Sequence, residues 1–183
     1  MGIRRNNKSG DTPKEPFEAV YEKYFSAIYN YVFGQVLHRE RAEDIVSDTF
    51  MKAMSHYDEF DPSRASVRTW LTNIARNVMI DDFRKGAIRN HSSLDDEENM
   101  IEPSYEDEYG IFREETAKEV YQLMTGLTEQ ERELIGMIYF QNMKNEEIGR
   151  VLGINAKAVS ERHRRVLAKC RKLASQGDLQ LLL

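Results

Sequence analysis

The stretch 144–172 places the tightest constraint on the fold. Gly153 separates a short apolar-periodic segment, 146–152, from a longer one. A glycine just past a helix adopts the left-handed conformation without steric cost, and Asn145 and Asn155 are each placed to cap the helix that follows. A short helix, a turn of about three residues and a longer helix form a helix-turn-helix. The sequence therefore predicts a helical pair of the kind that enters a DNA major groove.

The longer helix, 156–173, carries a buried stripe beside a basic one. Seven basic residues face one acid, Glu161, up to residue 172, and such a density repels itself unless an anion is nearby. A solvated helix with cations at its negative C-terminus is the alternative, but it leaves the turn at Gly153 unexplained. In such motifs the N-terminal half reads bases, and later cations touch phosphate. We expect base readers at Ser160, Glu161, Arg164 and Arg165, and phosphate contacts from Lys157, Lys169 and Arg171.

Apolar residues at helical spacing fill most of the remaining chain, and nothing in it is typical of a β-hairpin. Thr128 and Glu131 form the pattern of a capping box, which predicts a further helix start. The expectation is an all-α fold with two small helical domains. Earlier helices are predicted at 17–37, 39–56 and 66–85.

The inward faces of these helices follow from the same spacing. The second helix is expected to bury Ala42, Ile45, Val46, Thr49, Phe50 and Ala53, and the third Val67, Leu71, Ile74, Val78 and either Met79 or Ile80. The helix after Thr128 is expected to turn inward Leu134, Ile135, Ile138 and Tyr139.

The acidity of the chain is concentrated in one stretch. Residues 86–112 carry a net charge of −7, whereas 17–85 carry −2 and the two end segments carry +2 each, for −5 in total. Eight carboxylates against one arginine are typical of a linker. We expect a disordered tail at 1–16, one domain at 17–85, an acidic linker at 86–112 and a helix-turn-helix domain at 113–183.

Composition excludes several other classes. Cys170 is the one cysteine, so no internal disulfide can form, and the four histidines have no second ligand at metal-binding spacing. No apolar run reaches the roughly 18 residues that a membrane span needs. No nucleophile-base set or phosphate-cradling loop is present. We expect no metal, no cofactor, no membrane insertion and no catalytic activity, and a cytoplasmic location.

One face of the third helix combines unusual residue types. Trp70, Asn73, Asn77 and Arg84 are spaced by 3, 4 and 7 residues, which places them on one side of a helix. Amides do not bury cheaply, whereas an aromatic ring with amides and a cation suits an exposed nucleic-acid strand. For Trp70, packing in the core is an equally acceptable reading.

Several strings of residues carry a resemblance that covers 17–173. The chain resembles the extracytoplasmic-function sigma factors, small two-domain specificity subunits of bacterial RNA polymerase. The strings are AEDIVSDTF at 42–50, RTWL at 68–71, IARN at 74–77, EEIG at 146–149 and LGI at 152–154. The family often has Gln-Glu at 47–48 and Ala at 149, where this chain has Ser47-Asp48 and Gly149.

The resemblance implies a role for each part. Asp44, Ser47 and Asp48 would dock on the clamp helices of the largest polymerase subunit, and the second domain would meet the flap of the second-largest subunit and read the minus-thirty-five element. The linker would cross the polymerase cleft, unless it is only a spacer. An anti-sigma factor is a further implied partner, and it could hold the chain at the membrane. The minus-ten element of the promoter DNA would be melted by Trp70, Asn73, Asn77 and Arg84, with a flipped base held by the loop containing Phe60, Arg64 and Ser66.

Two other functions fit the helix-turn-helix alone. A self-standing repressor or activator would use 17–85 for dimerisation or sensing and would bind duplex DNA tightly by itself. A helical adaptor that binds only proteins would show no salt-dependent affinity for DNA. A sigma factor should bind DNA poorly without the core enzyme.

Overall fold

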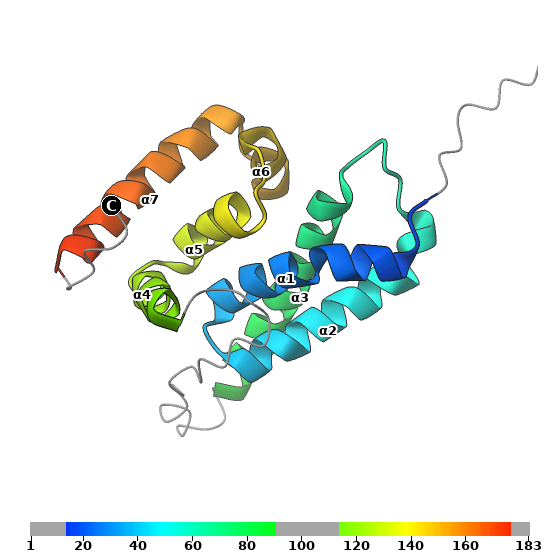
Figure 1. Ribbon diagram of the computed structural model, residues 1–183, viewed down its shortest axis with the longest axis horizontal. Helices are drawn as coiled ribbons and strands as arrows, with labels where there is room; N and C mark the ends of the chain where they lie inside the picture. The colour runs from blue at the N-terminus through cyan, green and yellow to red at the C-terminus, as the bar shows by residue number, and fades with distance from the viewer. Residues whose placement is uncertain (1–13, 91–113, 177–183) are drawn as a thin grey trace, which may run out of the picture.

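The computed structural model describes residues 14–90 and 114–176, and over these ranges the chain is helical with no strand (Figure 1). This confirms the all-helical prediction for the described part. The elements are α1 (Phe17–Val36), α2 (Arg39–Ser55), the 3₁₀ turn η1 (Tyr57–Glu59), α3 (Val67–Asn90), α4 (Glu114–Thr125), α5 (Glu129–Ile135), the π turn η3 (Gly136–Phe140), α6 (Asn145–Leu152) and α7 (Ala156–Gln176).

Helices α1, α2 and α3 pack on one another to form the first domain. The buried face of α2 is the predicted one, from Ala42 to Ala53. On α3, Met79 is buried and Ile80 is 37% exposed, which settles the alternative left by the spacing. Helix α3 continues to Asn90, five residues past its expected end at 85. The first part of the expected acidic linker is therefore helical, and the rest of it lies outside the described residues.

The second domain consists of α4 to α7. Its predicted capping box is confirmed, because the Thr128 N–H donates to Glu131 at 2.8 Å and the Glu131 N–H donates to the Thr128 hydroxyl at 3.3 Å. The expected burial of Tyr139 is wrong, since this residue is 55% exposed. The π turn η3 adds one residue to the helical turn, with Gln141 N–H bonding to Gly136 O. Met137 and Gln141 are fully buried there.

The helix-turn-helix comprises α6, a turn and α7. Gly153 has the left-handed conformation expected of it, with φ 67°. Asn155 caps α7, accepting from the Ala158 N–H at 2.8 Å. Asn145, however, does not cap α6. Lys144 is the residue before that helix and Glu147 accepts its N–H at 2.9 Å, while the Asn145 amide donates to Ser160 at 2.8 Å and so ties the two helices together.

The two domains pack against each other. In Figure 1, α5 lies between α7 and α1, and η3 and α5 both contact α1. Gln141 contributes polar bonds to this contact: its amide donates to the Ala27 carbonyl at 2.5 Å and accepts from the Thr72 hydroxyl at 3.5 Å. A buried amide needs such partners. The interface is therefore specified by polar contacts as well as by apolar packing.

Charged groups also join the domains. The guanidinium of Arg76 on α3 lies 2.6 Å from the Glu133 carboxylate on α5. Glu147 on α6 accepts from the hydroxyls of Thr69 at 3.2 Å and Ser66 at 3.4 Å. The backbone N–H of Lys144 and these hydroxyl donors hold the pKa of Glu147 below its usual value, against the effect of burial. We call this arrangement the closed form.

The start of the described chain is more ordered than its composition suggests. Lys14 and Glu15, which belong to the expected tail, contact Tyr57: Lys14 donates to the Tyr57 carbonyl, and the Tyr57 hydroxyl donates to the Glu15 carbonyl at 2.7 Å. The expectations for 1–13, 91–112 and 177–183 lie outside the described residues. Within 14–90 and 114–176, none of the helices combines the length and apolar character needed to cross a bilayer.

Candidate nucleic-acid interface

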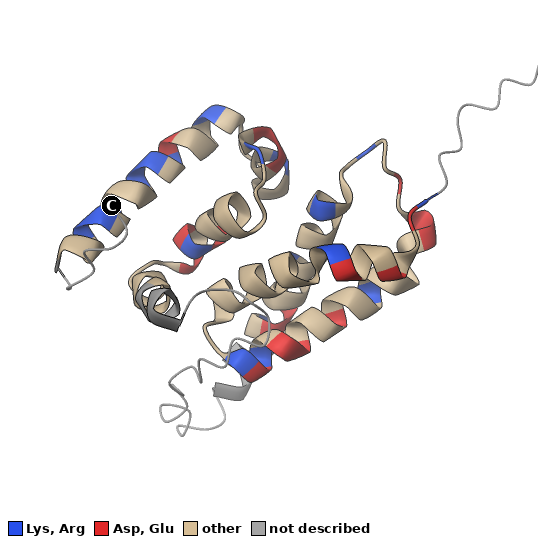
Figure 2. Cartoon of the chain, in the orientation of Figure 1, with Lys and Arg blue, Asp and Glu red and all other residues tan. Residues whose placement is uncertain are grey.

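Helix α7 has a buried apolar face and an exposed basic face, as the spacing of its residues predicts. Val159 and Val166 are buried against α6 and the rest of the second domain. Lysines and arginines recur along the helix, with Glu161 as its one acid up to residue 172 (Figure 2). The proposed contact residues that are exposed are Lys157, Ser160, Glu161, Arg164, Arg165 and Arg171. This face is therefore open to a ligand in the closed form.

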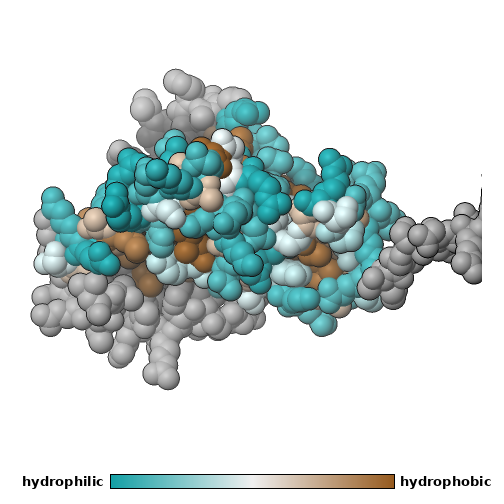
Figure 3. All heavy atoms as spheres, turned by 90° about the horizontal axis from the view of Figure 1, so that it is seen from above, coloured by the Kyte–Doolittle hydropathy of each residue, from teal (hydrophilic) through white to brown (hydrophobic). Residues whose placement is uncertain are grey.

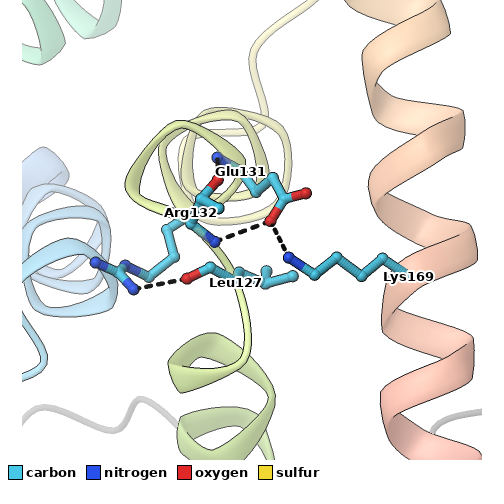
Figure 4. Close-up of polar contacts among 5 residues, drawn as sticks. Leu127, Glu131, Arg132 and Lys169 are labelled. Carbon is cyan, nitrogen blue, oxygen red and sulfur yellow. Dashed lines mark hydrogen bonds and ion pairs between the residues drawn. The ribbon is translucent and has the colours of Figure 1, made fainter.

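Lys169 differs from the other expected contacts. Its ammonium lies 2.5 Å from the Glu131 carboxylate, which reaches across from the start of α5 (Figure 4). Burial opposes ionisation of Glu131, but hydrogen bonds from Lys169 and Thr128 outweigh it and lower the pKa of the carboxyl. Lys169 is thus occupied in fixing α7 on α5. A phosphate would have to compete with Glu131 for it.

His163 lies at the edge of the buried stripe of α7. Its Nε2 is 3.1 Å from the Tyr139 hydroxyl. Partial burial lowers the pKa of His163 below the usual 6.5. The imidazole is therefore neutral near pH 7 and adds no charge to the basic face.

The depressed pKa of His163 predicts a pH dependence of stability. The unfolded chain binds a proton at about pH 6.5, whereas the folded domain binds it only at lower pH, so the free energy of unfolding falls as pH drops below that value. Urea midpoints measured at about pH 7.5 and about pH 5.5 should fall more in the wild type than in His163→Gln. Equal falls in the two proteins would contradict this assignment.

A hollow of about 410 Å³ opens beside α3 in the first domain. Its lining includes Phe60, Trp70, Ile74 and Asn77. The Phe60 and Trp70 rings lie 4.8 Å apart, and Tyr57 is 6.0 Å from Trp70. Trp70 is half-buried, so it packs on the core and also borders the hollow. The two readings of Trp70 are compatible in this position.

Sequence reasoning missed three other residues that line this hollow: Lys52 and His56 at the end of α2, and Glu59. These residues were not singled out because they are far from Trp70 in sequence. Their signal was weak: a lysine near the end of α2 and a histidine just after it are four residues apart and both exposed. These three residues give the hollow polar groups and a cation.

Other predicted residues of this face lie outside the hollow. Arg64 is exposed in the loop before α3, and Asn73 is half-buried. Ser66 bonds to Thr69 at 2.9 Å and to Glu147, so the second domain occupies it in the closed form. Arg84 is exposed, 3.7 Å from Asp81, and about 20 Å along the helix from Trp70. Of the residues expected to contact the minus-ten element, only Phe60, Trp70 and Asn77 line the hollow.

The expected docking edge is exposed and borders an apolar hollow. Asp44, Ser47 and Asp48 all face solvent on α2. Ser47 also lines a second hollow, of about 370 Å³, between α1 and α2. Its wall includes Met51 at 63% and Met54 at 61% exposure. Elsewhere, on the face seen in Figure 3, hydrophobic residues appear as patches among hydrophilic ones.

Packed aromatic rings form part of the lining of this second hollow. Tyr21 lies 4.8 Å from Phe50 and 5.1 Å from Phe25, and Phe25 lies 6.3 Å from Tyr29. Rings at these separations stabilise each other beyond their buried area. The exposed methionines therefore lie beside a packed aromatic cluster. Among the described residues no group of three or more His, Cys, Asp or Glu could hold a metal ion.

Comparisons with known proteins agree with this arrangement. The model of Sigma-70 region 2 matches residues 20–88, and that of Sigma-70, region 4 matches 123–172. The chain is 26% identical over 164 residues to the ECF RNA polymerase sigma factor SigX of Bacillus subtilis, covering 87% of this chain and 84% of SigX.

Two solved structures share the fold. The sigma factor RpoE of Bartonella quintana, in complex with the anti-sigma factor NepR, has a TM-score of 0.70 at 22% identity, over 87% of this chain and 96% of that one. CnrH, in complex with the cytosolic domain of CnrY, has a TM-score of 0.63 at 26% identity, over 87% and 88%.

The site and fold define a two-domain helical DNA-binding protein with a helix-turn-helix at its C-terminal side. The chain belongs to the sigma-70 family and is an extracytoplasmic-function sigma factor of RNA polymerase. It directs transcription initiation from promoters as a subunit without catalytic activity of its own.

Proposed function

We propose that the first domain docks on core polymerase and opens the minus-ten element, and that the second domain reads the minus-thirty-five element. The observation that carries this proposal is the hollow lined by Phe60, Trp70 and Asn77, since it offers an aromatic platform and an amide at one place. Bases stack on such platforms without strong sequence preference, and amides read their edges. An unpaired minus-ten base fits this chemistry.

The exposed face of α7 supports the second assignment. Ser160, Glu161 and Arg164 occupy the N-terminal half of the helix, which reaches base edges in this motif. An arginine can make two hydrogen bonds to guanine, and a glutamate can accept from cytosine. Lys157 and Arg165 lie beside them for phosphate or base contact, whereas Lys169 is occupied by Glu131. We assign minus-thirty-five specificity chiefly to Glu161 and Arg164.

We assign core docking to a surface on α2 that combines the acidic edge with the apolar hollow beside it. The clamp helices of the largest subunit are the proposed partner for Asp44, Ser47 and Asp48, and the flap of the second-largest subunit for the second domain. The support for extending the surface is the adjoining pair Met51 and Met54, which are exposed and line the same hollow as a group of packed aromatic rings. Flexible methionines suit an interface that must adapt to a partner.

A Met54→Glu variant is expected to weaken core binding at least 10-fold, because a buried charge at an apolar contact costs more than the lost packing. Met54 is 61% exposed, so the fold should be unaffected. Fluorescence titration of labelled protein with core polymerase measures the affinity. The matched control is Ile80→Glu, which places the same charge at an exposed apolar position on a different helix, α3, and should leave core affinity unchanged. Unchanged affinity in Met54→Glu would remove this hollow from the docking surface.

In the closed form the two DNA-binding surfaces lie too close together to contact both promoter elements at once. Elements centred roughly 25 base pairs apart are separated by about 85 Å of B-form DNA. In the closed form Glu147 lies 3.2 Å from Thr69, next to Trp70. The chain from Glu147 to Arg164 spans at most about 40 Å, even with the turn fully extended. We therefore propose that the domains separate when the chain engages polymerase and promoter.

Separation would break identifiable contacts. Gln141 would leave the Ala27 carbonyl, and the ion pair of Arg76 with Glu133 would be lost. Each of these groups can be rehydrated in the open form, so the net cost per contact is far below its strength in isolation. Binding to polymerase and DNA can offset such a cost. The acidic segment 91–112 between the domains would supply the necessary length.

An anti-sigma factor is the proposed regulator. The support is that RpoE, which shares this fold, was solved in complex with the anti-sigma factor NepR. Such a protein would have to cover either the docking edge on α2 or the basic face of α7, because both are exposed in the closed form. A membrane-held regulator would keep the chain at the cytoplasmic side of the membrane.

Reconstituted transcription with core polymerase over a random promoter library tests the proposed function. We expect initiation from sequences that share two elements at fixed spacing, and weak DNA binding by the chain alone. Tight binding of the isolated chain to a palindrome would favour a self-standing regulator. Core association without any salt-dependent DNA affinity would favour an adaptor.

A further inference from the structure

The contact between the domains is closely packed at two glycines, one in each domain. A Cβ added to Gly136 of η3 would lie 2.8 Å from the Tyr31 ring on α1, and one added to Gly34 of α1 would lie 2.9 Å from the Phe140 ring of η3. Neither glycine has a positive φ, so its own backbone would accept an alanine. Both positions therefore need to lack a side chain only while the domains are in contact.

The same contact buries polar atoms that have no hydrogen-bond partner. The Tyr31 hydroxyl and the Gln35 amide nitrogen are two of them, and both side chains lie against Gly136. The hydroxyl is also within electrostatic reach of Arg76 and Glu133, the pair that bridges the domains. An unpaired buried group costs roughly 5- to 150-fold in the equilibrium that buries it. Over the part of the chain that the structure describes, the other such atoms are on helices that contact the opposite domain: Asn30 Oδ1, Arg68 Nε and Arg132 Nε.

This interface therefore contains contributions of opposite sign. Close packing, the bonds of Gln141 and the pair of Arg76 with Glu133 favour the closed form. The unpaired polar atoms favour the open form, because separation of the domains admits water to them. A contact of this composition holds the free chain closed, yet it costs little to break when each domain gains another binding partner.

We propose that Tyr31, packed on Gly136, acts as an autoinhibitory latch that holds the free chain closed until core polymerase binds. This rests on the proposed function, because the latch matters only if the domains must separate on polymerase. A protein whose binding-competent form is only partly populated binds more weakly in proportion to that fraction. The latch therefore lowers the affinity for polymerase from a position outside the docking edge. It leaves the basic face of α7 exposed.

The test measures the affinity of the full-length chain for core polymerase by fluorescence titration. Tyr31→Phe removes the unpaired hydroxyl and keeps the ring, so the closed form is favoured and the affinity should fall at least about 5-fold. Gly136→Ala introduces the Cβ that meets this ring, so the closed form is disfavoured and the affinity should rise at least about 5-fold. Gly34→Ala overpacks the contact from α1 and should also raise the affinity. A purely structural role for these residues would give losses in all three variants.

Two controls fix the interpretation. Gly126→Ala overpacks the second domain alone, since its added Cβ meets Leu173 at 2.7 Å, and should leave core affinity unchanged. The wild type and the three latch variants are also titrated with a duplex that carries only the minus-thirty-five element. This affinity should be the same in all four proteins, because the reading face of α7 is exposed in the closed form. A loss of duplex affinity in Gly136→Ala would show a misfolded second domain, and Gly34→Ala then decides the test.

Several results would overturn the latch. Equal core affinity of Tyr31→Phe and the wild type would do so, and so would a Gly34→Ala protein that binds core polymerase no more tightly than the wild type. If wild-type holoenzyme selects promoters while these affinities do not change, the proposed function stands and the latch fails. If wild-type holoenzyme selects no promoter, both fail.

Discussion

A Gly149→Ala variant is expected to lose about 2 to 3 kcal/mol of stability in the second domain, at the upper end of overpacking costs. A Cβ at this position would meet the Ile154 carbonyl oxygen at 2.5 Å. That oxygen belongs to the backbone of the turn, so it cannot move without displacing α7 relative to α6. Urea denaturation followed by circular dichroism measures the effect, and minus-thirty-five recognition should weaken with it.

The sign of this effect is diagnostic, because glycine to alanine within a helix ordinarily stabilises by roughly 0.5 to 1 kcal/mol. Gly153→Ala is the matched comparison: nothing lies within 4 Å of its added Cβ, but its φ of 67° strains an alanine. That strain costs about 1 to 2 kcal/mol. A Gly149→Ala protein as stable as the wild type would show that the turn is more open than described.

Replacing Trp70 by alanine is expected to reduce promoter opening by about 5- to 150-fold, which corresponds to the 1 to 3 kcal/mol of stacking that one base gains on an aromatic ring. The ring borders the minus-ten hollow and packs on Phe60 at 4.8 Å. Permanganate reactivity of unpaired thymines measures opening. Trp70→Phe should retain much of the opening, since it keeps a stacking surface.

Half-burial of Trp70 means that the alanine variant also loses packing. Asn77→Ala separates the two effects, because Asn77 is exposed and lines the same hollow. This variant should keep wild-type stability and core affinity while opening less. Normal permanganate reactivity in both Trp70→Ala and Asn77→Ala would contradict the assignment of the hollow.

Sequence patterns predicted the helices and most of their inward faces, because burial follows helical period directly. The buried set of α2 is an example. The pattern failed at Tyr139, where the π turn η3 shifts the register by one residue and directs Met137 inward instead. Single-residue insertions of this kind leave no mark on apolar spacing. The ring of Tyr139 finds its partner in His163, which is far along the chain.

Contacts between the domains could not be predicted from the sequence, for a different reason. Gln141 is polar and was not assigned to any core, yet it is fully buried because Ala27 and Thr72 supply its hydrogen bonds. Both partners belong to the other domain. Likewise Lys169 has the spacing of a phosphate contact, and only the fold places Glu131 within 2.5 Å of it. In both cases the position of the side chain depends on hydrogen-bond or ion-pair partners that are distant in the sequence.

The central claim is that the closed form opens so that two reading surfaces reach two promoter elements. The direct measurement is the distance between spin labels on α3 and α7, placed by Ile80→Cys, outside the docking surface, and Arg162→Cys, with Cys170 replaced by alanine. We expect one short distance distribution in the free chain. In holoenzyme bound to promoter DNA the distance should increase by several tens of ångströms, as a separation of about 85 Å between the elements requires. The same short distance in the promoter complex would contradict the account.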